Sequence, residues 1–194
     1  AKDWKKIRIG VEGAYPPFSS LAADGRLVGF DIDIAQALCA KMGAECTLVQ
    51  QDWDGMIPAL MARKYDAIIA SMAITEERKQ KVAFTDKYYQ VPAKFARKKG
   101  SAIEITKAGL EGKVIGVQRV TTHDNFISGE FGSAVEIKRY ATQDEAYLDA
   151  VAGRLDLLLA DSVPLQDSFL DTDQGKDWEF VGPGYTDIKY YGAG

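Results

Sequence analysis

Residues 62–71 read ARKYDAIIAS and residues 152–161 read AGRLDLLLAD, and the similarity of these two stretches indicates the architecture of the chain. Each stretch leaves a helical segment and enters a short apolar run, a pattern typical of a buried strand. A second pair precedes them in the same order, IGVE at 9–12 and IGVQ at 115–118. This ordered recurrence indicates two versions of one α/β plan, with chance similarity between apolar strands as the alternative. The repeat is too degenerate and too long in period for a solenoid.

Strand and helix signals alternate along the chain and predict α/β architecture with largely parallel sheets. Side chains that can accept hydrogen bonds from the free N–H groups of a first helical turn predict helix starts at Asp31, Thr75, Thr121 or Thr122, and Thr142. Gly43 predicts the end of the first helix. We expect strands at residues 7–11, 46–50, 66–70, 113–118, 135–140 and 155–160, and helices at 31–42, 57–63 and 142–153.

The composition excludes some classes of protein. The 194 residues have room for one large domain or two small ones. The net charge of −4 comes from 24 basic and 28 acidic residues spread along the chain. Without a basic stripe, no nucleic-acid partner is predicted, and without a run of about twenty apolar residues, no membrane span is predicted. The first residues lead directly into a strand, as in a processed secreted protein and equally in a cytoplasmic one.

The two cysteines flank the predicted helix end. Cys39 lies late in the helix, Cys46 opens the following strand, and the glycine between them allows the chain to reverse. Such a reversal can bring two Cα atoms within disulfide reach, and two separate buried thiols are the alternative. The only histidine, His123, is far away in sequence, so no metal site is predicted.

Four polar side chains follow the repeated strands. Ligands of open α/β sheets bind beyond the carboxyl ends of the strands. The repeat places Glu12 and Ser71 at such ends in the first half, and Gln118 and Asp161 in the second. If the halves face each other, these side chains point into one cleft.

Tyr15 and Trp53 follow the first two strands on loops marked by proline and glycine. An isolated aromatic residue on such a loop usually caps the core. Two of them beside Glu12 indicate a pocket for a cationic group, held by the ring faces and neutralised by the carboxylate.

A second group of residues suits an amino-acid backbone. Arg78 follows the 71–75 loop at a helix start, where a guanidinium fork matches a carboxylate, although a solvated helix charge is the alternative. Thr121 and Thr122 open a helix in the other half and can add donors, and Asp161 suits an α-ammonium group. The two groups together predict a cationic amino acid as ligand.

No catalytic residue and no cofactor are predicted. The chain has neither a phosphate-binding glycine-rich loop nor a nucleophile elbow. His123 is expected to be a solvated residue in the first turn of a helix, with a general base as the alternative.

Several longer motifs extend these patterns: AYPPFS at 14–19, GFDIDIAQALC at 29–39, WDGMIPAL at 53–60, YDAIIASMAITEER at 65–78, FTDKYY at 84–89, GVQ at 116–118 and AGRLDLLLAD at 152–161. From residue 7 to its end, the chain resembles the periplasmic amino-acid-binding proteins of ABC importers. It is similar to the branch that binds lysine, arginine and ornithine, histidine, or opines.

The resemblance implies a type II periplasmic-binding-protein fold with two α/β lobes and a ligand cleft between them. It implies lobe one at residues 1–90, lobe two at 91–184 and a second crossover at 185–194. We expect this chain to lack the family's C-terminal return segment, lobe one to be incomplete, and self-association to be possible. It also implies a periplasmic location after removal of a signal peptide, and an ABC permease in the membrane as partner.

The resemblance also implies roles for single residues. Positions matching Glu12, Tyr15 and Trp53 hold the ligand side chain. Those matching Ser71, Arg78 and Thr122 hold its carboxylate, and that matching Asp161 holds its α-amine. A disulfide between Cys39 and Cys46 is a feature of that branch.

The sequence departs from the branch at the pocket. Ala70 and Ala73 stand where the lysine and histidine binders carry serines, and Gln118 stands where they carry leucine. These changes leave the particular ligand open. A dehydratase-type enzyme on the same fold, with Glu12 as general acid, and a ligand-sensing module of a receptor are the alternative functions.

Overall fold

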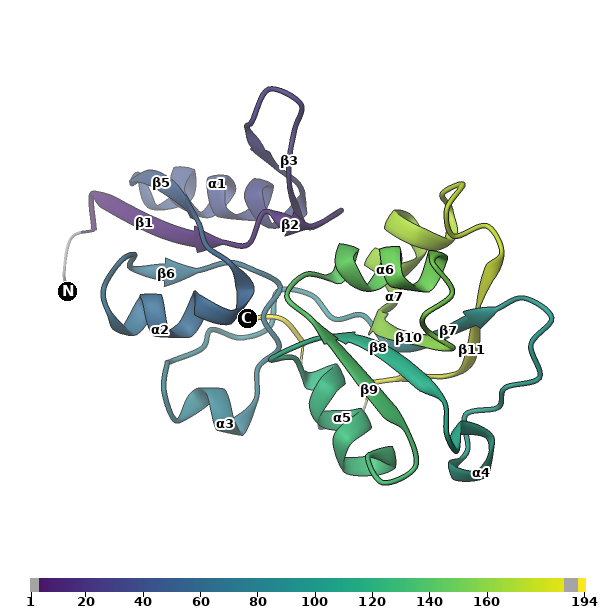
Figure 1. The fold of residues 1–194 in the computed structure, drawn as a ribbon. Helices are drawn as coiled ribbons and strands as arrows, with labels where there is room; N and C mark the ends of the chain where they lie inside the picture. Colours follow the sequence, from purple (N-terminus) through teal and green to yellow (C-terminus); the bar gives the residue numbers. More distant parts are fainter. Residues whose placement is uncertain (1–3, 187–191) are drawn as a thin grey trace. The chain divides into compact units, whose positions relative to one another are not determined.

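The computed structural model describes residues 4–186 and 192–194 (Figure 1). The chain forms two compact units. Unit 1 comprises residues 1–89 and 192–194, and unit 2 comprises residues 90–191. The crossover predicted at residues 185–194 falls partly on 187–191, which lie outside the described residues. Ala193 forms antiparallel bridges with Ala73 and Tyr89, so the described residues after 191 pair within unit 1.

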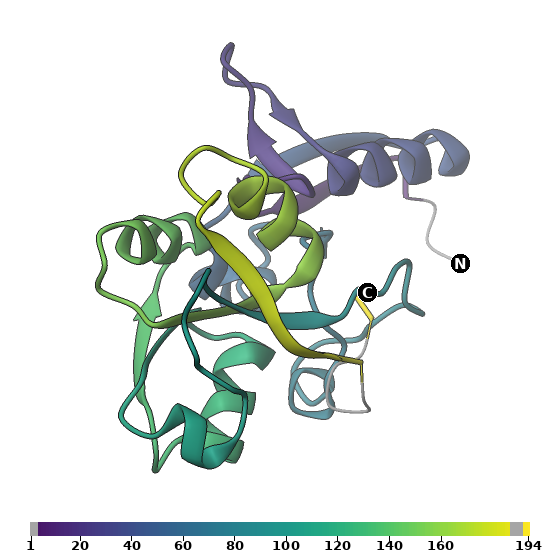
Figure 2. The ribbon, with the colours of Figure 1, turned by 90° about the vertical axis from the view of Figure 1, so that its right-hand side faces the viewer.

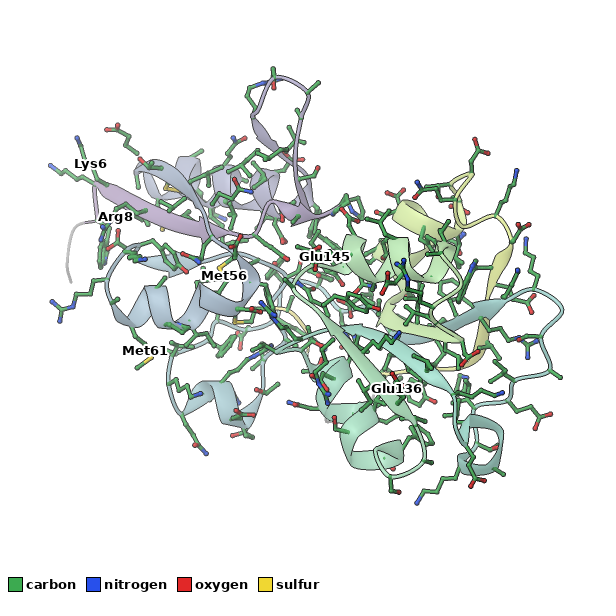
Figure 3. All side chains as sticks on the ribbon, in the orientation of Figure 1. Lys6, Arg8, Met56, Met61, Glu136 and Glu145 are labelled. Carbon is green, nitrogen blue, oxygen red and sulfur yellow. A yellow bond between two sulfur atoms is a disulfide. The ribbon has the colours of Figure 1, made fainter. Side chains whose placement is uncertain are left out.

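Unit 1 is built on a parallel sheet in the order β5-β1-β6, with β5 at Glu45–Gln50, β1 at Lys6–Val11 and β6 at Ala67–Ile68. Alternate residues of β1 pack with the buried face of helix α1 (Phe30–Met42). Helix α2 (Met56–Met61) follows a 3-10 turn at Trp53–Gly55 and contributes to a second apolar cluster. Met56 is fully buried whereas Met61 on the same helix is 61% exposed (Figure 3), which shows the amphipathic character of α2.

Two smaller elements complete unit 1. Strands β2 (Ala14–Tyr15), β3 (Ser19–Leu21) and β4 (Leu27–Val28) form an antiparallel sheet. Helix α3 (Glu76–Lys79) follows the loop at 71–75. Residues in and next to these elements are among those that the sequence predicts to bind a ligand.

Unit 2 contains a mixed sheet in the order β11-β7-β10-β8-β9 (Figures 1 and 2). Strands β10 (Leu157–Asp161), β8 (Val114–Gln118) and β9 (Glu136–Tyr140) are parallel. Strand β7 (Ala93–Lys98) runs antiparallel to both β10 and β11 (Trp178–Tyr185). The expectation of largely parallel sheets therefore holds in the main sheet of unit 1, whereas the sheet of unit 2 is mixed.

Helices cover both faces of the unit 2 sheet. One apolar cluster joins the sheet to α6 (Gln143–Val151), α7 (Ser162–Leu165) and the π-helical turn at Gln166–Leu170. The other joins it to α4 (Lys107–Leu110) and α5 (Thr122–Phe131). Figure 1 shows α6 and α5 on opposite sides of β8. Burial on both faces explains why β10 reads as a continuous apolar run.

The repeated sequences make the same backbone contacts in both units. In unit 1, Asp66 accepts a hydrogen bond at Oδ2 from the Arg8 N–H at 2.9 Å and donates its own N–H to the Arg8 carbonyl at 2.9 Å. In unit 2, Asp156 forms the same pair of bonds with Val114, both at 2.8 Å. Each aspartate thus sets the register of its strand against the first strand of its repeat.

The repeated glycines have a packing role. A Cβ atom at Gly10 would lie 2.6 Å from Cζ of Tyr65, and one at Gly116 would lie 2.4 Å from Cδ1 of Leu155. Tyr65 and Leu155 occupy the same position of the repeated stretch. Glycine is needed in IGV because this side chain packs directly on the strand.

Most predicted helix ends are confirmed. Thr75, Thr121 and Thr142 each accept a hydrogen bond from the backbone N–H three residues later. Glu145 completes a capping box with Thr142 at the start of α6, where Figure 3 labels it. Gly43 ends α1 in the left-handed conformation, with φ 64°.

Two predicted boundaries are wrong. Asp31 does not cap α1, because the N-cap is Gly29 and Asp31 lies in the first turn with its side chain buried. A Cβ atom at position 29 would lie 2.4 Å from the Phe18 carbonyl oxygen, so the approach of the chain requires glycine. The strand expected at 66–70 is shorter, at Ala67–Ile68, with backbone bonds to β1 from Asp66 and Ile69 on either side, and the chain turns away at Ser71, where φ is 52°.

Candidate ligand-binding site

Unit 1 places its candidate residues on loops that follow the strands of its parallel sheet. Glu12 directly follows β1 and is 4% exposed. Its carbonyl oxygen accepts a hydrogen bond from Nε2 of Gln50 at 3.4 Å, which links the ends of β1 and β5. Tyr15 is buried in β2, and Trp53 is half-buried at the start of the 3-10 turn after β5. The carboxylate and both aromatic residues thus lie in the same unit, after the strands that the sequence predicted.

Arg78 is held against the loop at 71–75. Its Nη1 donates to the carbonyl oxygen of Ala73 at 2.9 Å, and its Cζ lies 5.4 Å from the ring centroid of Trp53. Thr75 caps α3 by accepting from the Arg78 N–H at 3.2 Å. The alternative of a solvated helix charge is therefore wrong, because the side chain is half-buried and fixed by an aromatic ring and a carbonyl group.

Ser71 belongs to a three-membered hydrogen-bond network. Its hydroxyl donates to Oδ2 of Asp31 at 2.7 Å, and its N–H donates to the Tyr88 hydroxyl at 3.1 Å. Tyr88 in turn donates to Oδ1 of Asp31 at 2.7 Å. We call this set of three residues the Asp31 network.

The Asp31 carboxylate is fully buried at the first turn of α1. Burial raises its pKa to about 6, and the hydrogen bonds from Tyr88 and Ser71 oppose this rise only in part. Burial and the neighbouring carboxylate raise the pKa of Tyr88, so the phenol keeps its proton.

Sequence reasoning missed the roles of Asp31 and Tyr88. A signal for Asp31 was present, because Asp31, Ala35 and Cys39 follow each other at intervals of four residues and share the buried face of α1. An acid on an apolar helix face needs a partner inside the protein. Nothing local identifies Tyr88 as that partner, because it follows 57 residues later.

Ala70 and Ala73 lie on either side of Ser71 along the chain. Ala70 is 2% exposed and belongs to an apolar cluster with Met56 and Tyr65. Ala73 is half-buried and uses its carbonyl group to hold Arg78.

Unit 2 places its candidate residues at the ends of β8 and β10. Gln118 ends β8, is buried, and donates from Nε2 to the Ala141 carbonyl at 3.0 Å. The Thr121 hydroxyl donates to the Gln118 carbonyl at 2.6 Å and accepts from the Asp124 N–H at 3.2 Å. Thr122 is the first residue of α5. The Thr121 hydroxyl thus serves the turn and the helix start.

Asp161 ends β10, and its Oδ1 lies 3.1 Å from Nε2 of His123 in the first turn of α5. His123 is 7% exposed, so the expectation of a solvated histidine is wrong. The side chain turns inward because a carboxylate from the neighbouring parallel strand provides a partner. The available signal was weak, since the two residues are 38 positions apart.

The two cysteines form a disulfide that joins the last turn of α1 to β5, with Cα atoms 6.1 Å apart. This prediction is confirmed, and the alternative of two separate thiols is wrong. Within residues 4–186 and 192–194, no group of three His, Cys, Asp or Glu side chains is placed to hold a metal ion. In the same described ranges, no helix is long and apolar enough to cross a membrane.

Comparison with known proteins identifies the family. Residues 7–167 match the bacterial extracellular solute-binding proteins, family 3, and the chain belongs to this family. It is 54% identical over 191 residues to the L-arginine-binding protein of Pseudomonas aeruginosa, a match that covers 98% of this chain and 74% of the relative. It is 43% identical over 189 residues to the lysine/arginine/ornithine-binding periplasmic protein of Escherichia coli, with 97% and 73% covered.

Solved structures give the same result for the fold. An ancestral arginine-binding protein bound to arginine is similar with a TM-score of 0.89 and 33% identity, covering 98% of this chain and 84% of that chain. The predicted α/β class and two-lobe type II fold are confirmed by this similarity. The named relatives are binding proteins rather than enzymes.

Proposed function

We propose that this chain is the solute-binding receptor of an ABC importer, that it acts in the periplasm, and that its ligand is a cationic amino acid. Arginine, lysine, ornithine, histidine and opine derivatives form the candidate set. The observation that carries the proposal is the buried carboxylate of Glu12 after β1, in the same unit as Tyr15 and the Trp53–Arg78 pair. A buried anion in the same unit as these aromatic residues suits an alkyl-ammonium or guanidinium group.

The amino-acid backbone has candidate partners in both units. We propose that Arg78 of unit 1 and Thr122 at the N-terminus of α5 bind the α-carboxylate, because guanidinium groups and free helix N–H groups both favour an anion. We propose that Asp161 of unit 2 binds the α-ammonium group. The names of the relatives support a basic amino acid, since they bind arginine or lysine, arginine and ornithine.

The test is a binding screen by calorimetry and thermal shift, on protein refolded to remove any retained ligand. Arginine, lysine and ornithine should raise the melting temperature, because a ligand at a hundredfold excess over its Kd adds about 2.7 kcal/mol of stability. Glutamate and leucine should produce no comparable shift. Equal stabilisation by glutamate and arginine would contradict the proposed ligand class.

Two variants connect the screen to the site. Glu12→Gln should weaken arginine binding by roughly 30-fold or more, because a buried cation would lose its countercharge. Glu111→Gln, an exposed acid at the end of α4, is the matched control. Arginine recovered unchanged after incubation separates a receptor from an enzyme, and a converted product would favour the dehydratase alternative.

A further inference from the structure

We propose that Asp31 is a positioning residue that, together with Tyr88, fixes the backbone of Ser71 and thereby places the loop at 71–75 for ligand binding. The proposal rests on the proposed function, since the value of a fixed loop depends on Arg78 and its neighbours contacting a ligand. No direct contact between Asp31 and the ligand is required.

The conformation of Ser71 needs such support. Its φ of 52° lies in the left-handed region, which is unfavourable for a residue with a Cβ atom. Residues held in such conformations persist only where the surrounding structure determines them. At Ser71 two hydrogen bonds stabilise this conformation: the backbone N–H donates to Tyr88, and the side-chain hydroxyl donates to Asp31.

The network uses every donor that Ser71 has. A serine offers one N–H and one O–H, and both are engaged within unit 1. In this arrangement the Ser71 side chain can only accept hydrogen bonds from a ligand, which argues against the α-carboxylate contact that the family resemblance implies for Ser71. The Ser71 hydroxyl keeps its proton directed at Asp31 only while both Asp31 oxygens act as acceptors, because Tyr88 and Ser71 each donate to a different one.

The loop connects this network to Arg78. After Ser71 the chain passes through Ala73, whose carbonyl oxygen accepts from the Arg78 guanidinium, and reaches Thr75, which caps the helix that carries Arg78. The direction in which the chain leaves Ser71 thus sets the position of the carbonyl group that holds the arginine. A change at Asp31 should reach the ligand through the loop backbone.

The protonation state of Asp31 adds a readout that a purely structural role would not show. The groups that face its carboxylate are the Tyr88 phenol and the Ser71 hydroxyl, and burial raises its pKa to about 6. Protonation of Asp31 turns one of its two acceptor oxygens into an O–H donor, which weakens the hydrogen bonds that the two hydroxyl groups make in the observed geometry. Ligand affinity should fall as the pH drops through about 6.

The experiment measures arginine affinity by calorimetry between pH 5 and 8, because arginine itself does not titrate in this range. Asp31→Asn keeps the shape but provides only one acceptor oxygen, and it should bind roughly tenfold more weakly at pH 7.5 and lose the step near pH 6. Tyr88→Phe should also bind more weakly. Asp33→Asn, an exposed acid in the same helical turn, is the matched control.

His123 requires a control of its own, because its ring nitrogen lies 3.1 Å from the carboxylate that we propose binds the α-ammonium group. The series is repeated in the His123→Gln background, where a step that belongs to Asp31 must remain. Binding by Asp31→Asn and Tyr88→Phe within twofold of the parent, with an unchanged pH profile, would overturn the proposal.

A ligand-free measurement separates this proposal from the proposed function. In a double-mutant cycle, Asp31→Asn and Ser71→Gly should change the denaturation midpoint non-additively, because glycine adopts a positive φ without support. If no amino acid binds but the cycle shows coupling, the ligand assignment is wrong and the network stands. Additive effects would refute the proposed control of Ser71 by Asp31.

Discussion

Reduction of the Cys39–Cys46 disulfide should lower the free energy of unfolding of unit 1 by about 2.4 kcal/mol. The two cysteines are seven residues apart in sequence, and a short closed loop removes a limited amount of chain entropy from the unfolded state. Cys39 is 4% exposed, and reduction leaves its sulfur atom in the core. The change therefore measures the cross-link and leaves the packing almost intact.

Hydrogen exchange with mass spectrometry can localise this effect. Amides of β1, α1 and β5 that exchange through unfolding of unit 1 should exchange about 50-fold faster after reduction, since 1.4 kcal/mol corresponds to a factor of ten. Amides of β8 and β10 in unit 2 are the internal control and should not change. The chain contains only these two cysteines, so a reductant acts at one bond.

A Cys39→Ser, Cys46→Ser variant provides the second control, because its exchange should be the same with and without reductant. An acceleration below fivefold in unit 1 of the parent would refute the loop-closure reasoning. An equal acceleration in β8 would show that the effect is not confined to the unit that carries the bond.

Three further predictions concern single side chains. Gly10→Ala should destabilise the protein by about 1–3 kcal/mol in urea titrations, because the new Cβ meets the Tyr65 ring at 2.6 Å. Gly129→Ala is the control, because nothing lies within 4 Å of a Cβ atom at that position. Equal destabilisation by the two substitutions would contradict the packing argument. The raised pKa of Asp31 means that the folded state holds a proton which the unfolded state releases between about pH 4 and 6. Relative to Asp31→Asn, the parent should therefore gain up to about 3 kcal/mol of stability as the pH falls from 7.5 to 4, and a constant difference would show that this carboxyl is not buried. His123→Leu removes the hydrogen bond to the carboxylate that ends β10 and should weaken amino-acid binding about tenfold. His123→Gln keeps a donor and should retain most of the affinity. Equal losses of affinity in the two variants would exclude a positioning role for His123.

Elements with local signals were predictable. Thr75, Thr121 and Thr142 cap helices through bonds that span three residues, so the sequence contains both partners side by side. Strand β7 was not predicted, although its apolar residues Phe95 and Ala96 are fully buried. Its segment, AKFARK, is rich in basic residues, and its pairing with β10 and β11 joins parts of the chain that are far apart in sequence.

The residues of the candidate site likewise include some that the sequence located and some whose orientation it did not predict. The repeat predicted that Glu12 follows and Gln118 ends the first strand of each repeated stretch, and the structure places them there. The assignment of these side chains to a ligand stays a prediction that the binding screen tests. The inward orientation of Asp31 and His123 was not predicted, because Asp31 depends on hydroxyl partners and His123 on a carboxylate partner from distant parts of the chain.

The α/β class, the internal repeat, the three threonine helix caps and the family were readable in the sequence, because each of these depends on spacing or on short motifs along the chain. Only the tertiary structure decided the mixed pairing in unit 2, the Asp31 network and the His123–Asp161 pair. Ser71 and Tyr88 follow Asp31 by 40 and 57 residues, and Asp161 follows His123 by 38. No local pattern specifies such partners. They are selected when folding buries a polar side chain and leaves a particular hydrogen-bonding group within reach.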